Sequence, residues 1–134
     1  MILFVDDEAT RTARWREALA EVDEVQLAST AEAALGHFDT PTFMHTVRLV
    51  VLDLAMHTTG GLTGAETGLG RLTGDALRRR LRESGWRGPI VVLTNARDDD
   101  TKRRVEKDGD VFRRKSECLP SQLASLAKEL LSKN

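Results

Sequence analysis

The chain has a single cysteine, Cys118, and only three histidines, and both shortages restrict its function. One thiol cannot form a disulfide within the chain. The histidines His37, His45 and His57 lie too far apart in sequence to have the spacing of zinc ligands. We therefore expect neither a disulfide framework nor a zinc site, and a reducing cytoplasm is the compartment that suits this composition.

An excess of charge of one sign and a long apolar run are also missing. Twenty basic residues against twenty-one acidic ones leave a net charge of -1, which gives no overall attraction to nucleic acid or to an anionic membrane. The apolar run from Ile2 to Val5 is too short for a signal peptide or a membrane span, and Asp6 follows it at once. We expect no direct nucleic-acid partner and no membrane partner.

Short apolar runs alternate with helical patterns along the chain. The runs at 2–5, 47–52 and 90–93 are typical of strands buried on both faces, and weaker runs at 25–28 and 111–112 bring the expected number to five. Apolar periodicity and capping residues predict helices around 9–22, after Ser29-Thr30, from near Asp75, at 98–107 and from Pro120. This order predicts an α/β domain with a doubly wound, five-stranded parallel sheet, the flavodoxin-like (βα)5 arrangement.

The chain length fits one domain over residues 1–134, without a separate output domain. Residues 57–73 are rich in glycine and are expected to form an enlarged loop. The arginine-rich runs 78–82 and 102–104 are interpreted as solvated helix faces.

Polar residues follow four of the five apolar runs. Asp6 and Asp7 come after the first run, Asp53 after the third, Thr94 after the fourth and Lys115 after the fifth. Because ligands of open parallel sheets bind at the carboxyl ends of the strands, we expect these side chains to converge. Clustered carboxylates call for a cation, and oxygen ligands suit Mg²⁺. Carboxylates grouped with a hydroxyl and an ammonium are typical of metal-assisted phosphoryl transfer to an aspartate.

At these residues the sequence resembles the response-regulator receiver family of two-component signalling, over essentially the whole chain. The matching segments are ILFVDDE, VVLDLAM, IVVLTNA and VFRRK. The resemblance implies a phosphorylation-controlled receiver domain, not a conventional enzyme, with Asp53 as the phosphoacceptor. It also implies that Mg²⁺ is bound by Asp6, Asp7, Asp53 and the Ala55 carbonyl. Thr94 and Lys115 would contact the phosphoryl oxygens.

The same resemblance implies a switch and its partners. Phe112 matches the aromatic residue that turns inward as Thr94 moves toward the phosphoryl group. A histidine kinase or a phosphotransfer protein would donate the phosphoryl group, and a downstream protein would bind the surface of the fourth helix, fifth strand and fifth helix. The chain would be a monomer or a weak homodimer.

The sequence departs from the family pattern at four positions. His57 replaces the usual proline after the phosphoacceptor, and the glycine that opens the third helix, Gly74, comes late. Asn95 is bulkier than the usual residue after Thr94, and Ser116 replaces the proline after Lys115. These departures leave a second hypothesis open, a pseudo-receiver that acts as a phosphorylation-independent interaction module. A third, a Mg²⁺-dependent phosphatase or nuclease, lacks candidate ligands for a second metal.

Overall fold

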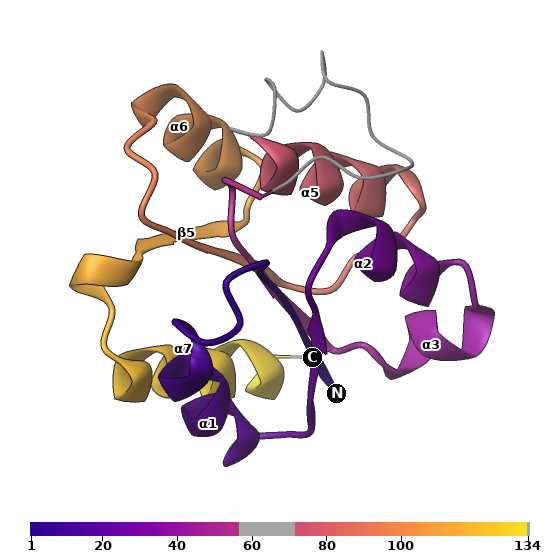
Figure 1. Ribbon diagram of the computed structural model, residues 1–134. Helices are drawn as coiled ribbons and strands as arrows, with labels where there is room; N and C mark the ends of the chain where they lie inside the picture. The colour runs from indigo at the N-terminus through magenta and orange to yellow at the C-terminus, as the bar shows by residue number, and fades with distance from the viewer. Residues whose placement is uncertain (57–71, 134) are drawn as a thin grey trace.

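The computed structural model describes residues 1–56 and 72–133, in which strands and helices alternate along the chain (Figure 1). The strands are β1 (Ile2–Val5), β2 (Val25–Ala28), β3 (Leu49–Leu52), β4 (Ile90–Thr94) and β5 (Val111–Arg114). The helices are α1 (Ala13–Ala20), α2 (Ala31–Phe38), α3 (Pro41–Thr46), α5 (Thr73–Glu83), α6 (Asp99–Lys107) and α7 (Pro120–Ser132), with a 3-10 turn at Lys115–Glu117.

The strands form one five-stranded parallel sheet in the order β2-β1-β3-β4-β5. The order reverses at β1, so the chain winds first toward one edge of the sheet and then toward the other. Strands β1, β3 and β4 are wholly buried, as their continuous apolar runs predict. The predicted doubly wound five-stranded sheet is therefore confirmed.

Helices cover both faces of the sheet and enclose two apolar cores. Helices α1 and α7 lie side by side on one face, whereas α2, α5 and α6 lie on the other (Figure 1). Alternate side chains of each strand enter different cores: in β1, Leu3 and Val5 join the core under α2 and α5, and Ile2 and Phe4 join the core under α1 and α7. This period of two follows from the pleat of the strands.

Local hydrogen bonds account for where two of the helices begin. The Thr30 hydroxyl accepts a hydrogen bond from Ala33 N at 3.0 Å before α2, and the Asp98 carboxylate accepts one from Thr101 N at 3.0 Å before α6. After α6 the chain turns through Gly109, whose φ of 88° is a conformation that glycine adopts without strain. This turn sends the chain directly into β5.

The structure differs from the sequence prediction in several local features. The short helix α3 was not predicted; it begins at Pro41, a residue suited to the first turn of a helix, and its Phe43 packs against the core. Helix α1 is shorter than the predicted 9–22, and α5 begins slightly before Asp75. Most of the predicted glycine-rich loop, together with His57, lies outside the described residues.

The interpretation of the arginine run 78–82 as a solvated face is wrong for Arg78. This residue is fully buried, and its guanidinium group bonds to three aspartates, two of them more than twenty-five positions away. Sequence periodicity could not reveal those distant partners.

Among the described helices, none combines the length and the apolar character required to cross a membrane.

Candidate functional site

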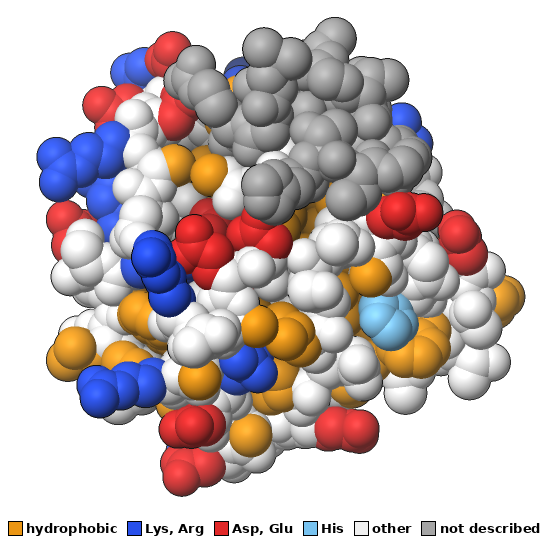
Figure 2. Space-filling view, in the orientation of Figure 1, with side chains coloured by type: hydrophobic (Ala, Val, Ile, Leu, Met, Phe, Trp, Pro, Cys, Tyr) orange, Lys and Arg blue, Asp and Glu red, His pale blue; other side chains and the backbone are white. Residues whose placement is uncertain are grey.

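Three charged side chains from three strand ends meet at one edge of the sheet. Lys115 Nζ donates hydrogen bonds to Asp6 Oδ2 at 2.9 Å and to Asp53 Oδ2 at 3.0 Å. None of the three side chains is more than 9% exposed. In Figure 2, acidic side chains gather in the middle of the visible face, with basic side chains nearby. The convergence of Asp6, Asp53 and Lys115 that the sequence predicts is present.

The parallel register brings these residues to the same level. Val5 pairs with Leu52, so the next residues, Asp6 and Asp53, leave β1 and β3 together. Asp53 N donates to Val5 O at 3.1 Å, which continues the ladder by one further bond. Lys115 follows directly after β5 and reaches across the end of β4. The lengths and register of the strands therefore place these residues close together, independently of their side-chain contacts.

Burial and charge act on the site in opposite directions. Burial raises the pKa of the Asp53 carboxyl, and neighbouring Asp6 adds to this, whereas Thr94 and Lys115 offset it only in part. For Lys115, burial would lower the pKa, but the attraction of Asp53 and Asp6 outweighs burial and raises it. One ammonium therefore contacts two carboxylates.

One oxygen of Asp53 is left for a further ligand. Among the described residues, Asp53 Oδ1 is buried and has no hydrogen-bond partner, although its other oxygen is paired with Lys115. Thr94, the last residue of β4, is fully buried, and its hydroxyl accepts a hydrogen bond from Ala96 N at 3.1 Å. An unsatisfied buried carboxylate oxygen is costly, and it is a feature expected where a ligand binds.

The predicted magnesium ligands are only partly assembled. Asp6 and Asp53 share Lys115, Asp7 follows Asp6 and is half-buried, and Ala55 is exposed just beyond Asp53. Over 1–56 and 72–133, no group of three or more His, Cys, Asp or Glu side chains is arranged to hold a metal ion. The donor chemistry suits Mg²⁺ because every candidate ligand is an oxygen, and Asp53 Oδ1 is unsatisfied.

Phe112, the predicted switch residue, and the segment after Lys115 both contact other elements of the fold. Phe112 is buried in the core on the α5 side of the sheet. Trp15 Nε1 of α1 donates to Cys118 O at 2.9 Å, which ties α1 to the segment that follows Lys115. Asn95 and Ser116, where the sequence departs from the family pattern, are both exposed. A role of Phe112 as a switch stays a prediction.

The beginning of α5 packs directly against the residues that follow β3. Gly74 N donates to Leu54 O at 2.9 Å, and Thr73 Oγ1 donates to Met56 O at 2.7 Å. A Cβ atom at Gly74 would lie 1.8 Å from Asp53 O, so no other residue fits there without movement. Sequence reasoning marked Gly74 as the opening of this helix but missed Thr73, for which the sequence carries no signal.

Comparisons with solved structures identify the fold. The receiver domain of NtrX from Brucella abortus is 23% identical, with a TM-score of 0.76 and full coverage of both chains. A response regulator receiver protein from Pseudoalteromonas atlantica is 16% identical, with a TM-score of 0.78 over 98% of this chain and 97% of that one. This chain has the receiver fold.

A third receiver domain extends the comparison. The BeF3-activated receiver domain of DrrB, a Thermotoga maritima response regulator, is 22% identical, with a TM-score of 0.71 over 98% of this chain and 96% of that one. No family model matches the sequence, and no curated protein matches it. The resemblance to receivers inferred from the motifs is therefore confirmed at the level of the fold, over nearly the whole chain.

Proposed function

We propose that this chain is a two-component response-regulator receiver that accepts a phosphoryl group on Asp53 and changes its protein contacts in response. The observation that carries the proposal is the contact of Lys115 Nζ with Asp6 and Asp53 at the carboxyl edge of a receiver fold. The donor would be a histidine kinase or a phosphotransfer protein. Such a domain would assist only its own phosphorylation and dephosphorylation, and would not be a conventional enzyme.

The chain's own side chains account for the chemistry. Asp53 Oδ1, which has no partner among the described residues, is the oxygen available to attack phosphorus as the bond to the donor breaks. Lys115 already lies against the other Asp53 oxygen and would hold an oxygen of the transferred group as a point charge. The Thr94 hydroxyl, at the adjacent strand end, would donate a hydrogen bond to the phosphoryl group once formed.

We include Mg²⁺ in the proposal, with Asp6, Asp7, Asp53 and the Ala55 carbonyl as its protein ligands. When bound, Mg²⁺ supplies positive charge against the phosphoryl oxygens. Asp6 has a second use: its Oδ1 accepts a hydrogen bond from Glu8 N at 2.8 Å, which fixes the carboxylate in place. Lys115 would then release Asp6 while keeping its contact with Asp53.

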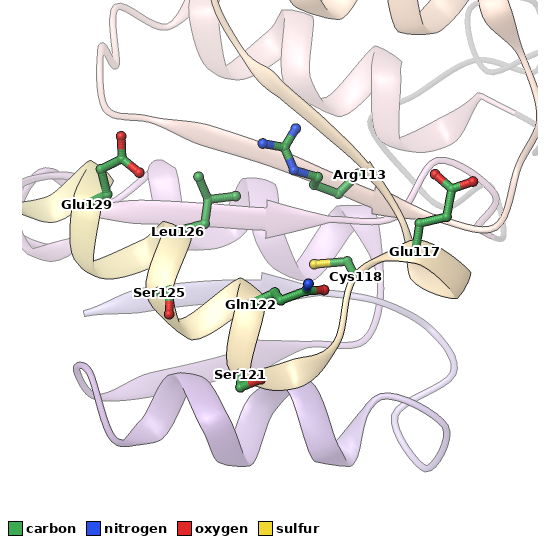
Figure 3. A pocket seen from close by; sticks show the side chains of 8 residues that line it. All are labelled: Arg113, Glu117, Cys118, Ser121, Gln122, Ser125, Leu126 and Glu129. Carbon is green, nitrogen blue, oxygen red and sulfur yellow. The ribbon is translucent and has the colours of Figure 1, made fainter.

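The partner surface in the proposal is formed by α6, β5 and α7. Two hollows lie on this surface on either side of β5. The hollow toward α7 is shown in Figure 3, where Arg113 of β5 and Glu117 of the 3-10 turn lie across from α7, whose Leu126 is among the lining residues. The hollow toward α6 is also lined by Arg113 and Glu117. A downstream protein with mixed charges and a small apolar contact would match these linings.

Beryllofluoride, a mimic of the aspartyl phosphate, tests the proposal. We expect saturable binding that requires Mg²⁺ and is lost in Asp53→Asn. Trp15 reports locally because its indole bonds to the Cys118 carbonyl, close to Lys115. Trp86 donates to Val47 O at the opposite end of the sheet and serves as an internal reference. Tryptophan fluorescence and amide chemical shifts would be recorded together.

Asp100→Asn is the matched control, because it makes the same chemical change at an exposed position of α6. It should bind beryllofluoride as the wild type does. A folded wild type that shows no Mg²⁺-dependent response would rule out the phosphoryl switch. Equal responses in wild type and Asp53→Asn would show that the ligand binds elsewhere.

A second candidate is the pseudo-receiver, an interaction module that does not depend on phosphorylation. The observation that favours it is that Lys115 already forms ion pairs with both Asp6 and Asp53, while no three-carboxylate metal group is assembled among residues 1–56 and 72–133. The beryllofluoride experiment separates the two candidates, because a pseudo-receiver would not respond.

A further inference from the structure

A cluster of charged side chains lies between α5, α6 and the start of β5. We refer to it as the α5–α6 charge cluster, which consists of Asp75, Arg78, Arg104, Asp108 and Asp110. Arg78 lies at its centre with a side chain only 1% exposed. Burial would lower the pKa of Arg78, but hydrogen bonds to its aspartate partners outweigh burial and raise it. The guanidinium group is therefore charged throughout the physiological range.

Asp75 joins α5 to α6 through both of its oxygens. Its Oδ1 accepts hydrogen bonds from Arg78 Nη2 at 2.9 Å and Arg78 Nε at 3.2 Å, within α5. Its Oδ2 accepts from Arg104 Nη2 at 2.7 Å and Arg104 Nε at 3.2 Å, across to α6. The Asp75 side chain is fully buried, and this two-sided pairing satisfies it.

The cluster also holds the end of α6. Arg78 Nη1 donates to Asp108 Oδ2 at 2.8 Å and to Asp110 Oδ2 at 3.0 Å. Asp108 is the C-cap of α6, and Asp110 directly precedes β5. Arg82, one turn further along α5, bonds to the second oxygen of Asp110. Helix α6 is therefore fixed to α5 at its middle and at its end.

The same stretch of α5 is fixed to the candidate site. Thr73 bonds to Met56 O, Gly74 bonds to Leu54 O, and Gly74 packs against Asp53 O. Asp75 comes next in the chain. A movement of the segment after Asp53 would therefore reach Gly74 through its backbone hydrogen bond to Leu54, Asp75 through the next peptide bond, and Arg104 in α6 through a charged contact.

We propose that the Asp75–Arg104 contact is a mechanical link that passes changes at Asp53 to α6, whether or not Asp53 is phosphorylated. Buried ion pairs add little net stability over apolar side chains of similar size, because the charges must lose their water. Because desolvating these charges costs free energy, we infer that the cluster serves to fix α5 and α6 in one relative arrangement. The link runs through α5, on a different route from the Thr94 and Phe112 pair.

Arg104→Gln removes this link with the least damage to the fold. Arg104 is 43% exposed, and its loss leaves Asp75 paired with Arg78 and Arg79, which both belong to α5. Arg104→Lys keeps the charge but not the two-pronged geometry, and should restore part of the link. Arg103→Gln is the control, because its partner Asp100 is exposed and both belong to α6.

Asp53→Asn serves as the perturbation, since it changes the site without requiring phosphate or Mg²⁺. A failure of the link can therefore be told apart from a failure of the proposed phosphorylation. Amide chemical shifts of residues 99–107 would be compared before and after Asp53→Asn, in the wild type and in each Arg variant. Amide hydrogen exchange of α6 and α7 would be measured in the same proteins.

We expect Asp53→Asn to shift the α6 amides in the wild type and in Arg103→Gln. In Arg104→Gln these shifts should be lost, and the α6 amides should exchange about fivefold faster while those of α7 stay unchanged. Arg104→Lys should give an intermediate response. The link is refuted if the α6 shifts survive Arg104→Gln unchanged, or if Asp53→Asn leaves α6 unaffected in the wild type.

Discussion

Gly74 lies so close to Asp53 that a Cβ atom on the glycine would be 1.8 Å from the Asp53 carbonyl oxygen. The contact is with backbone, which cannot rotate away as a flexible side chain would. We therefore expect Gly74→Ala to push α5 from the end of β3 and to lower the free energy of unfolding by about 2 kcal/mol or more. Urea denaturation followed by circular dichroism would measure the loss.

Gly36→Ala is the matched control for this substitution. Gly36 lies within α2, and a Cβ atom there would meet nothing within 4 Å. Alanine is the better helix former, so this variant should gain roughly 0.5 to 1 kcal/mol. Equal losses in the two variants would contradict the close packing of Gly74 against Asp53.

The ionised Asp53 carboxylate should lower stability at neutral pH. Burial raises its pKa above the ordinary 3.8, even with Lys115 beside it. A carboxyl whose pKa is raised by folding favours the folded state only while protonated, and this advantage is lost as the pH rises through the folded pKa. We expect Asp53→Asn to be more stable than the wild type at about pH 7, with the difference shrinking as the pH falls toward about 4.

Chemical denaturation across that pH range, with Asp100→Asn as the exposed comparison, would test this expectation. The comparison variant should follow the wild-type pH profile, since Asp100 is exposed and its ion pair with Arg103 lies on the surface. If the wild type were the more stable protein at neutral pH, the contact with Lys115 would outweigh the burial of Asp53, and the ionised carboxylate would stabilise the fold.

The sheet and the meeting of its polar ends could be predicted because both depend on local patterns. Continuous apolar runs are buried on both faces in a parallel sheet, and the residue after each run must emerge at the carboxyl edge. Asp6, Asp53 and Lys115 were found in this way, and the register of β1 and β3 brings the two aspartates to the same level. The sequence did not reveal that Lys115 would bond to both carboxylates at once.

The α5–α6 charge cluster could not be predicted, because its partners lie on three elements. Asp75 and Arg78 have the i, i+3 spacing of neighbours on a helix, which was a usable signal. Nothing near Asp108 or Asp110 marks them as partners of a residue about thirty positions earlier. Charged runs are normally solvated, and here tertiary packing overrides that expectation for one arginine.

Lys115 should be required for stability as well as for the proposed chemistry. Its removal in Lys115→Met leaves Asp6 and Asp53 buried side by side without a cation. Breaking a buried ion pair from one side is costly, and we expect a loss of about 3 kcal/mol by urea denaturation at neutral pH. The pKa of the Asp53 carboxyl should also rise further, because Lys115 is one of the groups that lower it.

The double variant Lys115→Met, Asp53→Asn separates charge from packing. Neutralising Asp53 removes the repulsion from Asp6, so Asp53→Asn should stabilise the Lys115→Met protein by more than it stabilises the wild type. Additive effects of the two substitutions would show that Lys115 acts by filling space and not through its charge.

Arg78 should be the most costly arginine to replace. Arg78→Met keeps much of the side-chain volume but leaves Asp75, Asp108 and Asp110 without their shared cation. Two of these carboxylates are almost wholly buried, and we expect a loss of about 3 to 5 kcal/mol in the free energy of unfolding. Arg103→Gln, at an exposed position, should leave the melting temperature unchanged. A stable, folded Arg78→Met protein would mean that the surrounding arginines or water can satisfy these aspartates, and that Arg78 does not organise the cluster.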